Sequence, residues 1–297
     1  MRITDILKKQ RPICSFEFFP PKTNEETAQL FQTLKELKIL APAFISVTYG
    51  AGGGTKDRTL EIVERAKSEI GLESAAHLTC VGHSRQELRE ILRQLVQSGI
   101  ENVVALRGDP PKGEARFVAH PEGFRYGSEL IQFIRATYPL CIAAAGYPEG
   151  HIESASREAD WGHLEEKVKA GADLIITNLF FENRHFFDFE KSMHERGISI
   201  PIIPGIMPIT NFQQILKFTS ICGATIPERV VRDLGAIQHE PEAVRKYGIE
   251  YAKNQCRALL AHGVPGIHFY TLNKSKATQE IIRCLENEGL LPKRLGI

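Results

Sequence analysis

The sequence has no excess of charge of either sign and no long apolar run. Lysine and arginine number 37 and aspartate and glutamate 36, a formal net charge of +1 over 297 residues. This balance argues against the basic surface of a nucleic-acid-binding protein. The first residues lack the apolar core of a signal peptide, and no run reaches the ~18 apolar residues that a membrane span needs. We therefore expect a cytoplasmic protein with neither a membrane nor a nucleic-acid partner.

Several chemical motifs are also missing. The six cysteines are scattered, without a Cys-x-x-Cys pair, which is typical of reduced thiols. There is no His-Glu-x-x-His zinc motif, no carboxylate cluster for a divalent cation and no Gly-x-Ser-x-Gly nucleophile elbow. We therefore expect no metal site and no serine hydrolase.

What the sequence does contain is one pattern repeated eight times: a short apolar run, a polar or glycine-containing turn, and an amphipathic helix. Dense apolar runs are typical of parallel strands that are buried on both faces. Eight such units predict a closed (β/α)₈ TIM barrel, an α/β fold, as a single domain over residues 1–297, with an extra helical segment at 227–264 before the last strand. The expected strands are 13–19, 43–49, 75–80, 102–106, 141–147, 173–178, 200–205 and 266–271.

Capping residues mark the ends of the expected helices. Ser84 and Glu87 have the spacing of a capping box, and apolar residues follow them at helical intervals. By the same pattern Thr210 and Gln213 are expected to cap a later helix, and Asn24 to open an early one.

An open, doubly wound sheet is the alternative for such alternation. It usually carries a Gly-x-Gly-x-x-Gly dinucleotide turn after its first strand, whereas here that strand ends in Phe-Phe-Pro-Pro. The glycine-rich stretch 50–56 follows the second strand and has the spacing of neither a dinucleotide turn nor a P-loop. We interpret it as a turn rather than a phosphate site, so the barrel is favoured.

Polar side chains gather where the expected strands end, which is where barrel enzymes carry out their chemistry. Glu17 is the most informative of them, because it lies between aromatic residues and burial disfavours its anion. We therefore predict a raised carboxyl pKa, suited to a general acid near neutral pH. The alternative is a glutamate that points outward and pairs with a helix lysine.

The other polar residues each allow two interpretations. Arg107 could bind a phosphate, or it could simply neutralise Asp109 in the turn that follows. His77, His151 and His268 could each belong to the site, or each could be a hydrogen-bonded structural residue. The aromatic segment 180–187 could stack on a flat ring or pack in the core. The residues alone make a flat, phosphate-bearing ligand plausible but specify no reaction.

Seven strand-end motifs stand in a fixed order along the chain. They are Ser-Phe-Glu-Phe-Phe-Pro-Pro (15–21), Ser-Val-Thr-Tyr-Gly-Ala (46–51), His-Leu-Thr-Cys (77–80), Ala-Leu-Arg-Gly-Asp (105–109), Gly-Tyr-Pro-Glu-Gly-His (146–151), Ile-Ile-Pro-Gly-Ile (202–206) and His-Phe-Tyr-Thr-Leu-Asn (268–273). The set closely resembles the methylenetetrahydrofolate reductase family. The length is similar to bacterial members that consist of the catalytic domain alone.

The resemblance implies a barrel oxidoreductase that binds FAD at the carboxyl ends of its strands. NADH or NADPH reduces FAD and leaves, and 5,10-methylenetetrahydrofolate then accepts the hydride in a ping-pong reaction. The product is 5-methyltetrahydrofolate, which serves one-carbon metabolism and methionine supply. Glu17 matches the family's general acid, which helps to protonate the folate as its five-membered ring opens. Asp109 matches a second catalytic residue that anchors the pterin and stabilises the cation. A homo-oligomer is also implied.

Further positions match ligand contacts of the family. The FAD-contacting positions are Thr48, Tyr49, Ala51, His77, Arg107, Gly108, Asp109, Gly127, Tyr147, His151, Asp160, His163 and Lys167. The substrate-contacting positions are Glu17, Asp109, Asn178, Gln214, Phe218 and Lys274. In the FAD-binding helix, His163 and Glu166 are more similar to eukaryotic members, and two of the substrate-contacting positions depart from the family pattern. Asn178 stands where many bacterial members have glutamine, and Lys274 replaces an arginine, which loses the bidentate fork.

Alternatives from other mechanisms and classes remain open. The same barrel could reduce the folate without stably bound FAD, by direct hydride transfer from NAD(P)H. It could instead be a subunit of a larger redox complex that is inactive alone, or a non-redox folate lyase or transferase.

Overall fold

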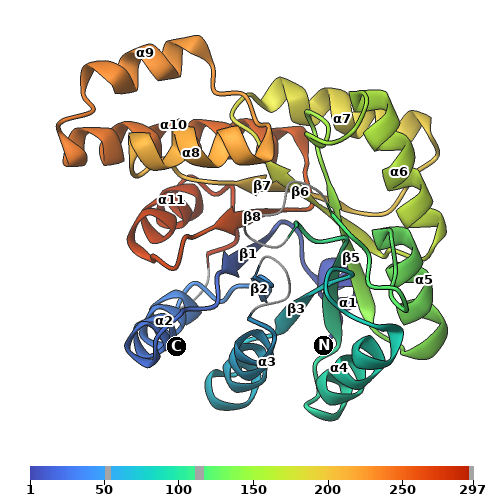
Figure 1. Ribbon diagram of the computed structural model, residues 1–297. Coiled ribbons are helices and arrows are strands. Elements are labelled where there is room, and N and C mark those ends of the chain that lie inside the picture. Colours follow the sequence, from blue (N-terminus) through green and yellow to red (C-terminus); the bar gives the residue numbers. More distant parts are fainter. Residues whose placement is uncertain (51–54, 111–116, 294–297) are drawn as a thin grey trace.

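The computed structural model describes residues 1–50, 55–110 and 117–293. Eight parallel strands form a closed barrel in which each strand pairs with the next and β8 pairs with β1 (Figure 1). The strands are β1 (Ile13–Phe18), β2 (Phe44–Val47), β3 (Ser74–Thr79), β4 (Asn102–Leu106), β5 (Cys141–Gly146), β6 (Leu174–Leu179), β7 (Ile202–Ile206) and β8 (Gly266–Tyr270). The predicted TIM barrel is confirmed, and the predicted strand ends agree with the observed ones to within two residues.

Helices surround the barrel, as Figure 1 shows. They are α1 (Ile3–Lys9), α2 (Asn24–Lys38), α3 (Lys56–Arg65), α4 (Arg85–Gln97), α5 (Gly127–Thr137), α6 (Arg157–Lys169), α7 (Asn183–Glu195), α8 (Phe212–Cys222), α9 (Glu228–Ala236), α10 (Pro241–His262) and α11 (Lys276–Asn287). A π-helical turn over Ala66–Ile70 continues α3. Among the described residues, no helix has the length and apolar character to cross a bilayer.

Strand β1 sends alternate residues to two different cores. Phe16 and Phe18 pack in the layer between the barrel and its helices, whereas Ile13 packs inside the barrel. Successive side chains of a strand point to opposite faces. Ser15 and Glu17 therefore share the interior side with Ile13, away from the two phenylalanines.

Helix starts follow the capping chemistry, although two caps lie one residue from their predicted positions. The Ser84–Glu87 capping box before α4 is confirmed. The cap of α8 is Asn211 rather than Thr210, and its side chain accepts a hydrogen bond from the backbone N–H of Gln214 at 2.8 Å. The capping residue needs extended backbone, and Asn211 has φ −154° and ψ 124°.

Helix α2 begins at Asn24 as predicted, but the residue that caps it is Thr23. Thr23 and Glu26 form a complete capping box there. Asn24 itself already belongs to the helix, so its side chain is one position too late to cap it.

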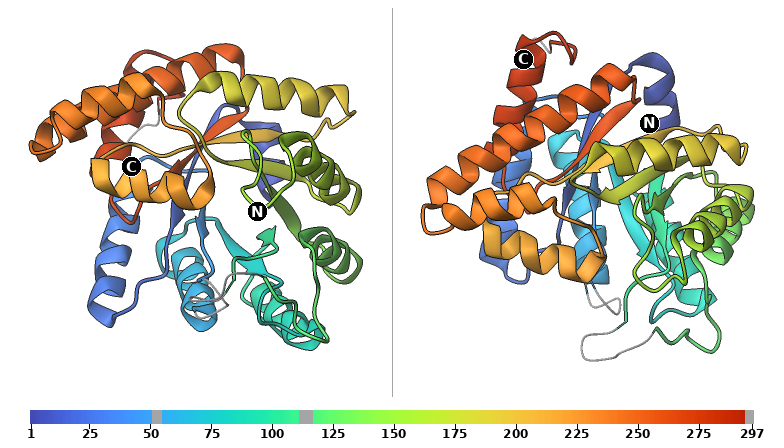
Figure 2. Two further views of the ribbon diagram at one scale, coloured as in Figure 1. Left: turned by 45° about the horizontal axis from the view of Figure 1, so that its top comes forward. Right: turned by 90° about the horizontal axis from the view of Figure 1, so that it is seen from above.

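The extra helical segment consists of two helices, α9 and α10. Helix α9 packs Val230 and Leu234 against Val244 of α10 and Phe212 of α8. It lies at the outer edge of the ring, outside α8 and α10, and the extension stands out from the barrel in both views of Figure 2.

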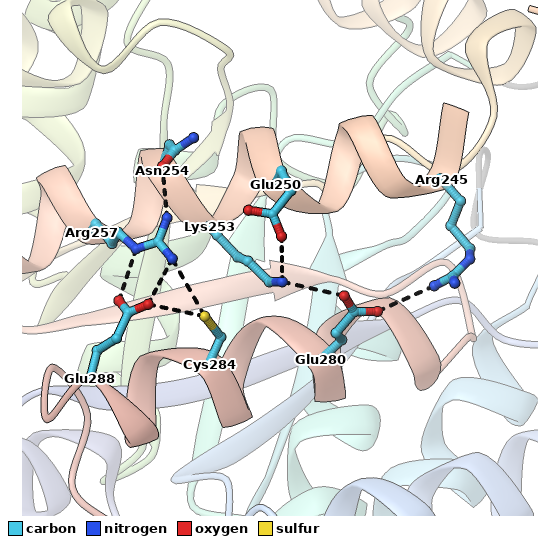
Figure 3. Close-up of polar contacts among 8 residues, drawn as sticks. All are labelled: Arg245, Glu250, Lys253, Asn254, Arg257, Glu280, Cys284 and Glu288. Carbon is cyan, nitrogen blue, oxygen red and sulfur yellow. Dashed lines mark hydrogen bonds and ion pairs between the residues drawn. The ribbon is translucent and has the colours of Figure 1, made fainter. Parts of the chain in front are cut away.

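Helices α10 and α11 are joined by a line of ion pairs (Figure 3). Lys253 is 7% exposed, and its ammonium lies 2.6 Å from Glu250 and 3.3 Å from Glu280. One turn further along α10, Arg257 binds both carboxylate oxygens of Glu288, at 2.8 and 2.7 Å. Because Lys253 is nearly enclosed, its charge is the member of this line that depends most on its partners.

Replacing Lys253 by alanine should destabilise the fold. Glu250 and Glu280 would then face each other without the cation between them, and we expect a loss of about 1–3 kcal/mol in the free energy of unfolding. Chemical denaturation followed by circular dichroism measures it. The control is Lys246→Ala on the same helix, because Lys246 is exposed and makes no ion pair with a described residue. Equal stability of the two variants would contradict the expectation.

Candidate active site

Glu17 lies inside the barrel near the carboxyl ends of the strands, 8% exposed. Its Oε2 is 3.2 Å from Nε2 of His77, 3.4 Å from Nε2 of His268 and 3.3 Å from the Ser46 hydroxyl, which donates to it. Strand register produces this cluster: Glu17 is the partner of Ser46 on β2, and Ser15 is the partner of His268 on β8. Side chains from β2, β3 and β8 therefore surround the carboxylate of Glu17 on β1.

The proton positions on His268 follow from its partners. The ring is fully buried, and its Nδ1 lies 2.7 Å from the hydroxyl of Ser15. An ionised carboxylate only accepts hydrogen bonds, so the Nε2 atom that faces Glu17 carries a hydrogen. In the neutral ring Nδ1 then accepts from Ser15, and in the imidazolium it donates to Ser15. His268 can therefore hold one or two protons while it stays in place.

His77 contacts Glu17 by charge rather than by a directed hydrogen bond. Its Nε2 is close to Oε2, yet this nitrogen has no hydrogen-bond partner of acceptable geometry among the described residues. The side chain is 7% exposed. A buried N–H group of this kind needs an acceptor, which a ligand can provide.

The predicted rise in the pKa of Glu17 is wrong. Burial by itself raises the pKa, but the charge of His77 and the hydrogen bond from His268 outweigh it and lower the pKa to about 2. The prediction failed because Phe16 and Phe18, its neighbours in sequence, point toward the helices. The groups that do face Glu17 are imidazoles, which stabilise the anion.

A cavity of about 370 Å³ opens at the same end of the barrel, formed by the segments that follow β2 to β5. Most of the predicted FAD-contacting residues line it. They are Tyr49, Arg107, Gly108, Asp109, Gly127, Tyr147, His151, Asp160, His163 and Lys167. Thr48 and His77 do not line it, and Ala51 falls outside the described residues.

Positive charge gathers on one side of this cavity. Arg107 and Lys167 line it together with Gly127, the first residue of α5, so the helix directs its amino-terminal N–H groups to the same place. Burial lowers the pKa of Lys167, an effect that nearby Asp160 opposes. Arg107 pairs with Glu153 at 2.7 Å, and this hydrogen bond lowers the pKa of Glu153. The arrangement is suited to a pyrophosphate.

Gly108 lets the backbone after β4 pack closely against Thr79 and Val81 in the wall of the cavity. Gly108 has φ +90°, and a Cβ atom there would lie 2.6 Å from Val81 and 2.9 Å from Thr79. The hydroxyl of Thr79 is buried and has no hydrogen-bond partner among the described residues. An unsatisfied hydroxyl in the wall of the cavity fits the polar edge of a ring such as a flavin.

Aromatic and acidic residues complete the cavity. Tyr147 and His151 meet edge to face at a centroid distance of 4.8 Å. Burial and then Asp109 raise the pKa of Tyr147, whereas burial and then Arg107 lower the pKa of His151. Both groups are therefore neutral at neutral pH. Asp109 itself is exposed at the cavity edge, free to meet a ligand.

The predicted substrate-contacting residues lie around the remainder of the barrel end. Asn178 is half-buried on β6, and Gln214 and Phe218 border a small hollow beside α8. Lys274 is exposed in the loop after β8. The side chain of Asn273 fixes this loop, because it accepts from the backbone N–H of Phe19 at 2.9 Å and donates to its carbonyl at 2.8 Å.

The sequence was compared with known proteins. Residues 2–286 match the family model described as methylenetetrahydrofolate reductase. The chain belongs to this family. It is 38% identical to the 5,10-methylenetetrahydrofolate reductase of Escherichia coli (strain K12), over 91% of this chain and 90% of that one.

Other methylenetetrahydrofolate reductases and one solved structure are also similar. Methylenetetrahydrofolate reductase (NADH) 1 of Arabidopsis thaliana is 40% identical over 98% of this chain, and the chain spans about half the length of the plant relatives that it matches. An uncharacterized protein from Clostridium thermocellum, described as binding two copies of 5-methyl-5,6,7,8-tetrahydrofolic acid, has a TM-score of 0.62. The match covers 97% of this chain and 100% of that one at 16% identity, so it speaks for the fold alone.

Membership of the reductase family did not reveal every residue of the site. Ser15 and Ser46 complete the Glu17 cluster. Ser15 lies two residues before Glu17, so the alternation of side chains along a strand could have placed both on the same face. Thr79 stands at a strand end, where polar residues were expected. For Glu153 the sequence holds no signal, because its partner Arg107 follows a different strand.

The low pKa of Glu17 predicts an ionised carboxylate down to acid pH. Isotope-edited infrared difference spectra between the protein and Glu17→Gln should show a carboxylate band, not a carboxylic acid band, from pH 7 to about pH 4. Because the pKa in the folded protein lies below the ordinary value of 4.5, the associated stability is present above 4.5 and is lost as pH falls toward 2. A carboxylic acid band at pH 7 would contradict the assignment.

Proposed function

We propose that the protein reduces 5,10-methylenetetrahydrofolate to 5-methyltetrahydrofolate with electrons from NADH or NADPH, carried by FAD in a ping-pong reaction. The observation that carries the proposal is the convergence of the family's FAD positions on one cavity at the barrel end that holds Glu17. Family membership supports the substrate, and the names of the plant relatives support NADH as a donor.

The cavity fits FAD on two counts: cations and a helix start for the pyrophosphate, and an unsatisfied Thr79 hydroxyl for a polar ring atom. FAD, when bound, accepts hydride from one substrate and gives it to the next. Arg107 and Lys167 would hold the pyrophosphate, and the buried carboxylate of Asp160 would serve the polar groups of the adenosine half.

Glu17 and its imidazoles act as one acid. The carboxylate alone has too low a pKa to hold a proton at neutral pH, but the His268 ring lies within hydrogen-bond distance of it, at 3.4 Å, and His77 lies 3.2 Å away. A proton bound by this cluster is available to the folate through Glu17 as the five-membered ring opens. His268 holds that proton between Glu17 and Ser15 until it is used.

The other substrate residues bind and position the folate. Asp109, exposed at the cavity edge, anchors the pterin and stabilises the positive charge that ring opening creates. Phe218 offers an aromatic face beside Gln214 on α8, and Asn178 supplies an amide with a shorter reach than glutamine. Lys274 supplies a cation for the folate tail. The chain would act as one catalytic domain of a cytoplasmic homo-oligomer that serves methionine supply.

Anaerobic stopped-flow absorbance on the flavin-loaded protein tests the function. NADH or NADPH should bleach the flavin, and 5,10-methylenetetrahydrofolate should restore its colour in a second step. A colourless purified protein that still reduces the folate would favour direct transfer. An isolated chain that is inactive with both donors would favour a subunit of a larger complex. Reduced flavin that the folate cannot reoxidise would refute the proposal.

Replacing Glu17 by glutamine should separate the two half-reactions. Reduction by NAD(P)H should continue, because no proton is delivered there, whereas folate-driven reoxidation should fall by about 10²-fold or more, the usual size of an acid–base contribution. The same stopped-flow traces measure both rates. Equal losses in both halves would make Glu17 a cofactor-binding or structural residue.

Replacing Lys167 by methionine should weaken FAD binding by about 10- to 100-fold, because one charge-assisted contact to the pyrophosphate is lost. Fluorescence titration of the flavin-free protein with FAD measures the affinity. The matched control is Lys169→Met on the same helix, whose side chain is 73% exposed and pairs with Glu165. An unchanged affinity in Lys167→Met would remove this lysine from the FAD site.

A further inference from the structure

A second cavity, of about 550 Å³, lies between the segments that follow β1, β2 and β3. It is next to the cavity of about 370 Å³ that we propose for FAD, called the flavin cavity below. None of the described residues at the family's FAD and folate positions lines it. Its lining residues are Pro21, Lys22, Thr55, Lys56, Asp57, Arg58 and His83. Three of these are cations and one is a carboxylate.

The first turn of α3 forms one wall of this cavity. The helix has ten residues and begins at Lys56, but the side chain of Thr55 before it makes no capping hydrogen bond. The Thr55 hydroxyl instead accepts from the backbone N–H of Gly50 at 2.7 Å. Among the described residues, the first N–H groups of the helix thus have no side-chain acceptor from Thr55, at the end of the helix where the dipole favours an anion.

The cations of the cavity are compensated only in part by described carboxylates, because Glu26 is close enough to Lys22 and Arg58 for their charges to lower its pKa. Lys22 and Lys56 make no ion pair with any described carboxylate. The Arg58 guanidinium donates to uncharged acceptors, including the Pro21 carbonyl at 3.2 Å. This bond holds Arg58 in the wall, where its charge also acts on the Glu26 carboxylate. Asp57 is the single acid among the described lining residues, so three cations outnumber the carboxylates of Asp57 and nearby Glu26.

His83 gives an independent indication of a ligand. Its ring lines the cavity, is 6% exposed, and has no hydrogen-bond partner at Nδ1 among the described residues. Nε2 lies 3.0 Å from the hydroxyl of Tyr49. Burial raises the pKa of Tyr49 and lowers that of His83, so the tyrosine keeps its hydrogen and the imidazole is neutral. In the tautomer in which the Tyr49 hydroxyl donates to Nε2, the ring hydrogen lies on Nδ1, where it is a buried donor without an acceptor among the described residues.

We propose that this cavity is an oxyanion subsite that binds a phosphate or carboxylate group through Lys22, Lys56, the start of α3 and the His83 ring. Tyr49 lines the flavin cavity and touches His83, so one hydrogen bond joins the two sites. On the proposed function, the anion is either a carboxylate of a folate tail that extends beyond Lys274 or a phosphate of NAD(P)H. Both would approach from the barrel end where Lys22 lies.

Calorimetric titration of the FAD-loaded protein with inorganic phosphate and pyrophosphate tests the site. The double variant Lys22→Gln/Lys56→Gln should weaken binding by about tenfold or more, because two charge-assisted contacts are lost. The control Lys9→Gln/Lys35→Gln removes the same charge from exposed positions outside the cavity and should bind as the unmodified protein does. No binding by the unmodified protein, or equal binding by the double variant, would overturn the proposal.

Nitrogen-15 NMR of the histidine rings provides a test that needs no variant of the lysines. Phosphate should shift the Nδ1 resonance of His83, assigned with His83→Gln, and leave the exposed ring of His239, which lines neither cavity, unmoved. A His83 resonance that stays fixed at saturating phosphate would also overturn the subsite.

Steady-state kinetics identify the source of the anion. A KM that rises in the double variant for triglutamyl but not monoglutamyl methylenetetrahydrofolate assigns the site to the folate tail. A KM that rises for NADH or NADPH assigns it to the donor phosphates, and four unchanged KM values would overturn a role with either substrate. Phosphate binding and NMR need no turnover, so failure of the subsite and failure of the proposed reductase activity are distinguishable.

Discussion

Pairing of β1 with β8 is the constraint on which the site depends. It brings Ser15 and His268, which are 253 positions apart in the chain, within 2.7 Å of each other, and it sets the His268 ring against Glu17. Without this closure Glu17 would keep Ser46 and His77 beside it but would lose the hydrogen bond from His268, and its burial as an anion would cost more. The closure of the barrel therefore also helps to keep the pKa of Glu17 low, together with the charge of His77 on β3.

The sequence predicted the barrel because apolar density, glycines and capping residues act over a few neighbours. Prediction from the sequence failed where the result depends on which way a side chain points or on the backbone angles. The pKa of Glu17 was inferred from Phe16 and Phe18, which are adjacent in the chain but occupy the opposite side of the strand. The cap of α8 moved by one residue for a similar reason, because the backbone angles of Asn211 and not its neighbours' identities fix where the helix begins.

The candidate site divides into two chemical environments. Around Glu17 the groups are imidazoles and hydroxyls that hold protons, and they come from the barrel interior. Around Arg107 and Lys167 the groups are charged and come from the segments after the strands. Family motifs located most residues of both regions, since each motif lies at a strand end. They could not locate the Arg107–Glu153 pair, which forms only when two separate loops meet.

The paired hydrogen bonds between Asn273 and Phe19 have a mechanical consequence. An amide that bonds both the N–H and the carbonyl of one residue acts as an additional rung of the sheet, beyond the last pair of β1 and β8. Asn273 adopts φ +59°, a left-handed conformation that asparagine tolerates well. The loops after β1 and β8 are thereby joined as one rigid edge. The distance between Glu17 in the barrel and Lys274 at its rim is therefore set by backbone geometry. A ligand that contacts both residues must have a length that matches this distance.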